Sequence, residues 1–515
     1  MTRCLRICGS YSYRLTRRHS TILLFIIFIL ILTTIFHLYG YKHKQQRRVP
    51  SQVGDFEYRP GSFLKNKQPN ENFTYCQFQY GLPKELKWNS LRIHNSPEIG
   101  GKGPYRVIYN AIKGTTFANF TKYNIVTYST HATPEFLYHV VEIARYWDGP
   151  ISLSVFVPNY DLDITMQIMT QLCRCYPGMA KISLHLFYHK NHPPKIRSQR
   201  EYLASLTTEI PTTTSNITIE QILKNKLDNY RKMNNKTRSQ YIQWVRKNKI
   251  ARMMKRMSLK KNSAPNLKFD DCSGPDYDIP TFRKENRIIY PINVGRNSAR
   301  NASLSNYFLV SDIEMVPSDG LAQKFLKMIR KLMGDKKRDE GCIFAKTIFV
   351  VPLFEVEKGE MIPRDKESLV RLVAANRAFY FHQRVCSHCQ RFPGLQSWLL
   401  RRSPSGVEPM LIARREYPYH RWEPLYFGTQ REPWYSETLS WEGRQDKMTQ
   451  MLELCLQEYR MVVLDGGFLS HAAATRTMAH HSNAERLNNQ KYLNIIGKLK
   501  QKYPDRPQCR VMWGC

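Results

Sequence analysis

Two carboxylates separated by one residue, Asp312 and Glu314, directly follow the apolar run YFLV at 307–310. The run predicts a buried strand, and side chains two residues apart on a strand point to the same face. Like charges held side by side repel each other, and a divalent cation would compensate them. Oxygen ligands suit magnesium or manganese, which commonly also bind substrate phosphates. The spacing therefore predicts a metal–diphosphate site, and the alternative is a solvated turn with incidental acids.

A third ligand is offered by His471 in the segment VVLDGGFLSH, residues 462–471. The histidine follows an apolar run and the flexible pair Gly466 and Gly467. Imidazole suits manganese better than magnesium. A single histidine after an apolar run is otherwise a structural residue.

The elements that must position these groups form a strand–helix–strand pattern. Residues 124–130 and 151–159 read as β-branched strands. Between them a helix begins at Thr133 as N-cap, with Pro134 at its first position. A second helix and a third strand at 181–189 continue the pattern. Such units build a parallel sheet, and ligands of open α/β sheets bind beyond the carboxyl ends of the strands.

The second half continues in the same style. Residues 287–303 predict a short strand running into a helix, followed by the 307–315 strand and an amphipathic helix at 320–333. Residues 342–356 predict one or two further strands, and the last helix is expected at 483–503.

The N-terminus predicts a membrane anchor. Residues 20–41 contain no Lys, Arg, Asp or Glu, and about 20 apolar residues span a bilayer, more than the ~7–15 of a signal peptide. We expect a cytosolic tail at 1–19, an uncleaved transmembrane anchor at 20–41, a stem at 42–120 and a luminal domain at 121–510.

Sequons and cysteines agree with a luminal body. The five Asn-x-Ser/Thr sequons all follow the anchor, at Asn72, Asn119, Asn216, Asn235 and Asn301. Ten of the twelve cysteines also follow it, which suits disulfides in an oxidising compartment. The CSHC motif at 386–389 has no second Cys/His pair at convincing spacing, so disulfides or free thiols are favoured there over zinc.

The formal net charge of +36 indicates an anionic partner. The anchor argues against nucleic acid. Within an expected insertion at about 190–285, residues 224–261 carry fourteen Lys or Arg against one acid. This stretch predicts either docking to an anionic membrane surface or acidic glycan, or simply a solvated insertion.

Six segments occur in an order that carries a family resemblance: SDIEMVPS, FVVPLFEV, CSHCQ, WEPLYF, GGFLSH and NNQKYLNIIGKLKQKYP. Together they resemble glycosyltransferase family 49, whose members act in the dystroglycan glycan pathway. The resemblance is close over roughly 285–510 and looser over the earlier strand–helix–strand region. The basic insertion has no counterpart in the family that we recognise.

The resemblance implies an α/β fold of the GT-A type, with a mixed, mostly parallel central sheet behind a single transmembrane helix. It also implies a Golgi type II membrane protein that uses manganese and a UDP-sugar donor, UDP-GlcA. The family's metal motif is Asp-x-Asp, where this chain has Asp312-Ile313-Glu314, and His471 matches the family's metal-binding histidine.

The implied partners are a glycan acceptor on a dystroglycan-like glycoprotein and, as further possibilities, a second copy or another glycosyltransferase. Arg296 and Arg300, in a segment that resembles the one ahead of the family's metal strand, are candidates for contacting the donor, because guanidinium pairs well with phosphate or carboxylate. Otherwise they are surface arginines on a helix.

The β-linked product of an α-linked donor requires inversion, and hence a base on the acceptor hydroxyl. Glu423 and Asp446 are the candidates, with Glu423 preferred as base or acceptor-binding residue. Beside it, the ring of Trp422 could stack on a sugar. The alternative for Glu423 is a structural acid capping a turn.

The leading hypothesis is thus transfer of glucuronic acid to a xylose-terminated O-mannosyl glycan. The alternatives are an N-acetylglucosaminyltransferase acting on poly-N-acetyllactosamine, and a non-catalytic glycan-binding homologue suggested by Glu314.

Overall fold

The computed structural model describes residues 29–30, 32–34, 68–70, 72–80, 91–195, 267, 271–274, 277–334, 343–387, 390–439, 445–472, 482–504 and 506–510. The chain divides into two compact units, Met1–Glu57 and Tyr58–Cys515, and the elements below belong to the second. Of the predicted anchor, the described residues 29–30 and 32–34 are helical. No helix among the described residues is long and apolar enough to cross a membrane. Most of the basic insertion, 196–266, lies outside the described residues.

The centre of the main sheet consists of four parallel strands in the order β6-β5-β4-β7. These strands are β4 (Val126–Ala132), β5 (Ile151–Phe156), β6 (Ile182–His189) and β7 (Tyr307–Val310). Every residue of these four strands is buried except His189, the last residue of β6. Burial on both faces explains why they read as apolar or β-branched runs without clear alternation.

Antiparallel strands extend this centre on both sides, so the sheet is mixed. Beyond β6 lie β3 (Tyr105–Lys113), β1 (Gln77–Phe78) and β2 (Ile93–Asn95); beyond β7 lie β13 (Leu425–Gly428), β9 (Thr347–Val351), β14 (Arg460–Asp465) and β12 (Glu408–Ala413). β9 and β14 pair in parallel. The described residues therefore confirm an α/β fold with a mixed, largely parallel central sheet.

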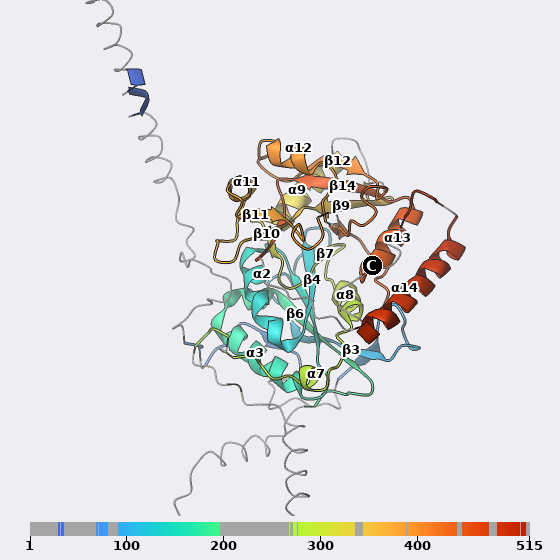
Figure 1. Cartoon of the computed structure of the whole chain (residues 1–515). Helices are drawn as coiled ribbons and strands as arrows, with labels where there is room; N and C mark the ends of the chain where they lie inside the picture. Colours follow the sequence, from blue (N-terminus) through green and yellow to red (C-terminus); the bar gives the residue numbers. More distant parts are fainter. Residues whose placement is uncertain are drawn as a thin grey trace, which may run out of the picture. The chain divides into compact units, whose positions relative to one another are not determined.

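Helices cover both faces of the parallel centre (Figure 1). Leu153 and Val155 of β5 join the core that includes η2 (Pro134–His139), α2 (Val140–Tyr146), α3 (Asp161–Cys175) and η3 (Pro177–Lys181). Ser152 and Ser154 point the other way, and their hydroxyls donate to backbone carbonyls of α8 (Ile292–Asn301). Because neighbouring residues of a strand face opposite sides, α8 covers the face opposite α2 and α3.

A second sheet of four strands has the order β11-β10-β15-β8. Its strands are β11 (Ala378–Tyr380), β10 (Leu353–Val356), β15 (Leu469–Ala472) and β8 (Val316–Pro317). The remaining helices are α7 (Phe282–Glu285), α9 (Leu321–Gly334), α11 (Lys366–Ala374), α12 (Leu395–Leu400), α13 (Met448–Leu456) and α14 (Ser482–Lys502). The two C-terminal helices α13 and α14 pack together around a separate apolar cluster (Figure 1).

The structure differs from the sequence prediction at two element boundaries. Residues 105–113, within the predicted stem, form β3 of the main sheet, where Val107, Ile108 and Ile112 are buried. The short strand expected before α8 does not form. Arg287 lies in a turn with a left-handed φ of 51°, and residues 288–291 have no regular secondary structure.

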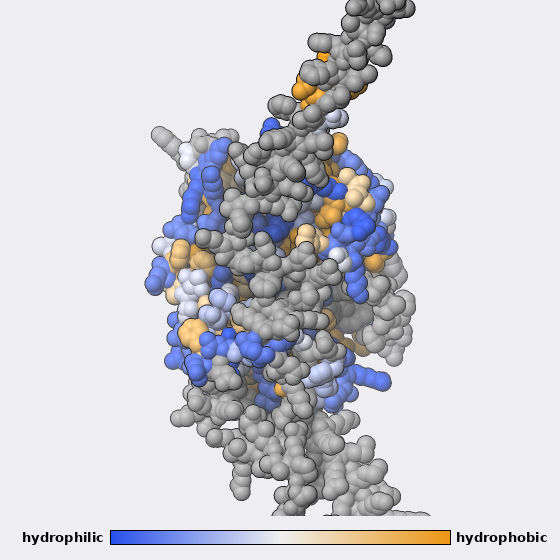
Figure 2. Space-filling view, turned by 90° about the vertical axis from the view of Figure 1, so that its left-hand side faces the viewer, coloured by the Kyte–Doolittle hydropathy of each residue, from blue (hydrophilic) through white to orange (hydrophobic). Residues whose placement is uncertain are grey.

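Disulfides join Cys76 to Cys173, Cys175 to Cys272 and Cys455 to Cys509. Cys386 of the CSHC motif is also disulfide-bonded, which favours the disulfide interpretation over zinc at that position. Cys389 lies outside the described residues. Figure 2 draws one face of the molecule, on which hydrophobic residues occur in small groups among hydrophilic ones.

Candidate active site

The Asp312–Glu314 pair lies in a turn beyond β7 rather than on the strand. The last ladder-like contact is from Ser311 N to Ser129 O, and Met315 N then donates to Asp312 O at 3.1 Å. That hydrogen bond closes a β-turn around Ile313 and Glu314. The expectation that both carboxylates share a face through strand alternation is therefore wrong, and each carboxylate has its own set of partners.

Glu314 lies beside His471, the residue with which it is predicted to share a metal ion. Its Oε2 lies 3.3 Å from His471 Nε2. The pairing follows from the second sheet, because β15 lies antiparallel to β8, only two residues beyond Glu314. The Gly466–Gly467 turn before β15 is tight: Gly466 has φ +79°, and a Cβ on Gly467 would lie 2.5 Å from Leu321 Cδ1. Neither position tolerates a larger residue without movement.

His139, at the end of η2, is a neighbour of this pair that the sequence did not indicate. Burial lowers the pKa of His139, while the charge of Glu314 opposes that shift. His139 is thus a neutral imidazole next to Glu314 and His471.

Asp312 faces a different set of groups. Its Oδ1 lies 3.1 Å from His131 Nε2 and 3.1 Å from an Arg296 guanidinium nitrogen. Burial alone would raise the pKa of the Asp312 carboxyl, but the positive charges of Lys447 and Arg296 hold it well below its usual range. Asp312 is therefore an anion, and its side chain remains 33% exposed.

His131 was missed in the sequence, although a signal for it exists. It lies near the carboxyl end of β4, which pairs in parallel with β7. The rule that ligands meet the carboxyl ends of neighbouring parallel strands applies to β4 as much as to β7. Burial lowers the pKa of His131, so the ring is neutral.

Arg296 does not lie on the surface. It is 1% exposed, and its guanidinium bridges two carboxylates: one nitrogen donates to Asp312 and the other donates to Asp446 at 3.0 Å. The positive charge of Arg296 lowers the pKa of Asp446 against the effect of burial. Arg296 therefore binds both Asp312, a predicted metal ligand, and Asp446, a predicted catalytic residue.

Glu423 is placed next to the same group by strand register. In the antiparallel pair of β13 with β7, Phe427 lies opposite Leu309. Because β13 runs antiparallel to β7, the start of β13 lies toward the carboxyl end of β7, and Glu423 precedes that start by two residues. The charges of Lys447, Asp446 and Arg296 act on its carboxyl there.

The Glu423 carboxylate is well suited to accept a proton. Its Oε1 is buried and has no hydrogen-bond partner among the described residues. Burial raises the pKa of Glu423, and the charge of Asp446 adds to the rise while that of Lys447 opposes it. Lys447, which the sequence did not indicate, has its ammonium 3.6 Å from Asp446 Oδ1.

Two other predicted residues have structural surroundings. Arg300 is 1% exposed and donates to the carbonyls of Thr429, Glu432 and Pro433, while its guanidinium lies 4.4 Å from the ring centroid of Trp434. Trp422 is 2% exposed and packs in the second core cluster. Neither side chain offers a free face to a sugar or a phosphate in this structure, so donor contact by Arg300 and sugar stacking by Trp422 stay predictions.

The residue types at Asp312, Glu314 and His471 fit a divalent cation. The 3.3 Å between Glu314 Oε2 and His471 Nε2 is close to the ~3 Å between neighbouring ligands of an ion with bonds of about 2.1 Å. No group of three or more His, Cys, Asp or Glu within the described ranges is arranged to hold a metal ion. The structure thus brings Glu314 and His471 together but does not bring Asp312 to the same point, since Asp312 is held by His131 and Arg296 instead.

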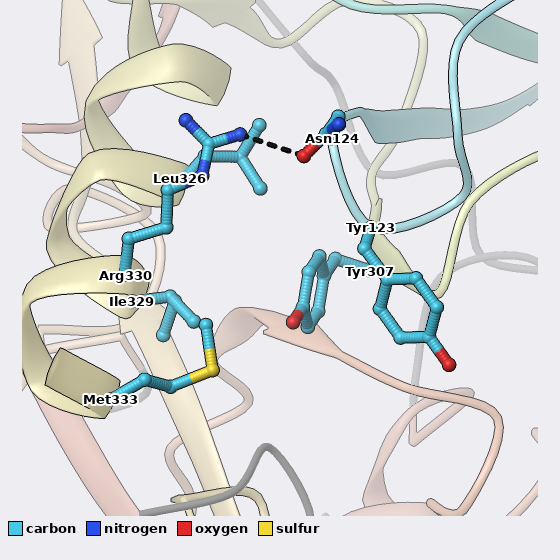
Figure 3. Close-up of a pocket in the computed structure, with 7 residues that line it drawn as sticks. All are labelled: Tyr123, Asn124, Tyr307, Leu326, Ile329, Arg330 and Met333. Carbon is cyan, nitrogen blue, oxygen red and sulfur yellow. Dashed lines mark hydrogen bonds between the residues drawn. The ribbon is translucent and has the colours of Figure 1, made fainter. Parts of the chain in front are cut away.

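A separate cavity of about 210 Å³ lies at the opposite ends of the parallel strands (Figure 3). It is lined by Tyr123, Asn124, Tyr307, Leu326, Ile329, Arg330 and Met333. Because Asn124 and Tyr307 precede or begin their strands while Asp312 follows β7, this cavity is not part of the candidate active site.

Comparison with known proteins identifies the setting of this site. Residues 125–504 match the family described as glycosyl-transferase for dystroglycan. The chain is 24% identical over 415 residues to beta-1,4-glucuronyltransferase 1 of Bos taurus, covering 80% of this chain and 82% of that protein. Its identity to the Danio rerio protein of the same name is 25% over 419 residues, covering 79% and 82%.

A shorter match is to a two-activity relative. Xylosyl- and glucuronyltransferase LARGE2 of Mus musculus is 28% identical over 227 residues, which is 42% of this chain and 28% of that protein. The family match itself contains every candidate residue from His131 to His471. The chain belongs to the glycosyltransferase family that acts on dystroglycan, family 49.

Proposed function

We propose that this protein transfers glucuronic acid from UDP-GlcA to a glycan acceptor on a glycoprotein, with inversion and with the help of a divalent cation. The observation that carries the proposal is that Asp312 and Glu314 follow the carboxyl end of β7, with His471 3.3 Å from Glu314 and Glu423 just before the neighbouring strand β13, within a region that matches the family. The relatives support the choice of sugar, since they are named as glucuronyltransferases.

The chain's own residues divide into a donor side and an acceptor side. Of the residues present, Glu314 and His471 would hold manganese, with Asp312 as the further predicted ligand, and the ion would supply Lewis-acid stabilisation of the departing UDP. Arg296 keeps Asp312 ionised and in place. On the other side, Glu423 would take the proton of the acceptor hydroxyl as its oxygen attacks the anomeric carbon.

Asp446 and Lys447 serve the base indirectly. Asp446 raises the pKa of Glu423, and Lys447 lowers it, so the pair adjusts the proton affinity of the base. Because Asp446 is bound by Arg296 and lies 3.6 Å from the Lys447 ammonium, it is a weaker base candidate than Glu423.

We further propose the Golgi lumen as the location, with the N-terminal segment as signal anchor. The disulfides Cys76–Cys173, Cys175–Cys272 and Cys455–Cys509 support an oxidising compartment. The sequon residues Asn72 and Asn119 are exposed and thus accessible to glycosylation. Removal of N-glycans from the protein made in intact cells should lower its mass, and an unchanged mass would contradict this topology.

A donor screen tests the activity. The purified full chain is incubated with manganese, a β-xyloside acceptor and, in turn, UDP-GlcA, UDP-GlcNAc, UDP-Xyl and UDP-Glc. Transfer from UDP-GlcA that stops with EDTA supports the proposal. Transfer from UDP-GlcNAc alone to poly-N-acetyllactosamine supports the second enzyme, and manganese-dependent binding of UDP without hydrolysis or transfer supports a non-catalytic homologue.

A further inference from the structure

An exposed pair of rings lies in the loop that leads to Glu423. Tyr417 is 71% exposed, and its ring stacks on the ring of His420 with a centroid distance of 5.6 Å and 18° between the planes. Trp422, which the sequence predicted to stack on a sugar, is only 2% exposed. The open aromatic surface beside Glu423 is therefore that of Tyr417, and such a surface suits the apolar face of a pyranose ring.

The loop between Tyr417 and Glu423 is compact. Tyr419 N donates to Glu416 O at 2.7 Å, and Trp422 N donates to Tyr419 O at 3.0 Å, so the loop consists of two successive turns. Six residues span at most about 20 Å even when fully extended, and the turns shorten that distance. An acceptor of a few sugars with its terminal hydroxyl at Glu423 can therefore reach Tyr417.

A buried guanidinium holds the loop in this form. Arg415 is 1% exposed, and its Nε donates to Trp422 O at 2.9 Å. Its two terminal nitrogens donate to the carbonyls of His420 and Arg510. Because a guanidinium is planar and rigid, its bonds to three carbonyls fix the loop in one geometry. The aromatic pair is thus held in place relative to the residue that precedes Glu423.

The same guanidinium lies next to the candidate active site. It contacts Met448 Sδ, and Met448 directly follows Lys447, whose charge interacts with Glu423 and Asp312. The positive charge of Arg415 also opposes the rise in the pKa of Glu423 that burial causes. Arg415 therefore connects the aromatic pair to the groups around the proposed base.

Hydrogen-bond donors accompany the open ring. The guanidinium carbon of Arg510 lies 5.9 Å from the centroid of the Tyr417 ring, and Arg510 is exposed. The disulfide of Cys509 with Cys455 anchors the chain next to Arg510. A sugar ring has an apolar face and a rim of hydroxyls, so an aromatic ring with guanidinium donors near it matches both parts.

We propose that Tyr417, supported by His420 and accompanied by Arg510, binds a sugar of the acceptor glycan that lies behind the terminal, reacting one. The place of the loop favours the acceptor over the donor, because the loop leads to the base, whereas Glu314 and His471 of the donor side lie at the second sheet. This inference rests on the proposed function and adds an acceptor subsite away from the reacting hydroxyl.

Acceptors of different length test the inference. The KM of the full chain for xylotriose should be lower than its KM for methyl β-xyloside, because only the longer acceptor reaches Tyr417. Tyr417→Ala should raise the KM for xylotriose by about 2- to 10-fold, the size of one aromatic contact, and remove the difference between the two acceptors. Tyr417→Phe keeps the ring and should keep the difference.

Tyr123 provides a matched control. It is 57% exposed, but it lines the cavity at the opposite ends of the parallel strands. Tyr123→Ala should leave the KM for xylotriose at the wild-type value. Equal losses in Tyr123→Ala and Tyr417→Ala, or a wild-type KM that does not depend on acceptor length, would overturn the inference.

Direct binding separates this inference from the proposed function. Calorimetric titration of the full chain with xylotriose, without any donor, requires no transfer. If the wild type transfers no glucuronic acid but binds xylotriose more tightly than Tyr417→Ala does, the proposed function fails and the subsite stands. If the wild type transfers glucuronic acid while Tyr417→Ala keeps both the KM and the affinity for xylotriose, only the subsite fails.

Discussion

At the scale of single residues, the carboxylates of the site differ in their surroundings and therefore in the direction of their pKa shifts. Asp312 has cationic neighbours and a lowered pKa, whereas Glu423 has a buried oxygen without a hydrogen-bond partner and a raised pKa. Groups whose surroundings move their pKa values apart are suited to different roles in one reaction. Asp312 suits charge stabilisation and Glu423 suits proton transfer.

Replacing Glu423 by Gln should lower kcat by about 10²- to 10⁴-fold, the contribution of a positioned base. Stability should change little, because Gln removes a charge that is buried without a hydrogen bond at Oε1. Glucuronic acid transfer and thermal unfolding provide the two measurements. Glu432→Gln is the control: Glu432 is another buried carboxyl with a raised pKa, but it holds the backbone of Thr429. If both variants lost the same kcat, Glu423 would not be the base.

A second residue affects stability rather than activity. Glu142 of α2 is 1% exposed, both its oxygens lack hydrogen-bond partners among the described residues, and burial raises its pKa from 4.5 to about 7. Because the folded pKa is the higher one, stability falls as pH rises from about 4.5 to about 7 and stays lower above it. The difference corresponds to about 3 kcal/mol.

Glu142→Gln should therefore be more stable than the wild type at pH 8 and lose most of that advantage at pH 4.5. Urea unfolding of both proteins at the two pH values measures the change. A stability difference between variant and wild type that is independent of pH would contradict a titrating Glu142.

At the scale of elements, α8 organises the site. All its residues but the last are buried, and its side chains reach both the parallel strands and the segment 429–446. Arg296 and Arg300 lie one turn apart on this helix. The first bridges the two carboxylates of the site, and the second holds the chain that follows β13. One helix thus fixes Asp312, Asp446 and the chain that follows β13 relative to one another.

Arg300→Lys should destabilise the protein by about 2–3 kcal/mol, since an ammonium cannot serve three separate carbonyls in the geometry of a guanidinium. The KM for the UDP-sugar should stay near the wild-type value. Chemical unfolding and donor kinetics provide the test, with Arg330→Lys, an arginine with one exposed hydrogen bond to Asn124, as the control. A raised KM with unchanged stability would instead support the donor contact predicted from the sequence.

Strands and helices were predicted well from the sequence, whereas contacts between side chains far apart in the sequence were predicted only in part. The runs at β4, β5, β6 and β7 are apolar or β-branched because both of their faces are buried, and this pattern is local. The Glu314–His471 pair was within reach because both residues lie in segments of the family resemblance.

Contacts that depend on long-range packing were not predictable in the same way. His131 meets Asp312 because β4 pairs with β7, and Lys447 approaches Asp446 and Asp312 through a turn with no regular pattern. The turn at Asp312 also escaped prediction, because its apolar residue Ile313 is buried as a strand residue would be. Composition does not distinguish a strand end from a buried turn.

At the scale of the whole molecule, disulfides join distant parts of the chain around the end of α3. Cys173 and Cys175 bond to Cys76 and Cys272, each across a sequence separation of 97. The second bond fixes the chain at Cys272, within the last part of the expected insertion. The carbonyl of Cys272 accepts from Tyr176 Oη there, and Gln171 donates to Asp271 O.

Removing this bond with Cys175→Ser and Cys272→Ser together should cost about 2–5 kcal/mol of unfolding free energy, as expected for a bond that closes a long loop. Chemical unfolding measures the loss, and reductant should lower the stability of the wild type but that of the double variant less. Equal stability of the variant and the oxidised wild type would mean that the hydrogen bonds around Cys272 hold this region unaided.

The pairing of β13 with β7 also limits which insertions and deletions the family can accept. Glu423 is separated from Asp312 by more than a hundred residues of chain, yet the antiparallel pairing brings the start of β13 toward the carboxyl end of β7, which Asp312 follows. Added or lost residues in the connecting loops leave that register unchanged. A single-residue deletion inside β13 would turn every preceding side chain to the other face. Insertions and deletions among relatives should therefore occur in the loops and be absent from the four residues of β13.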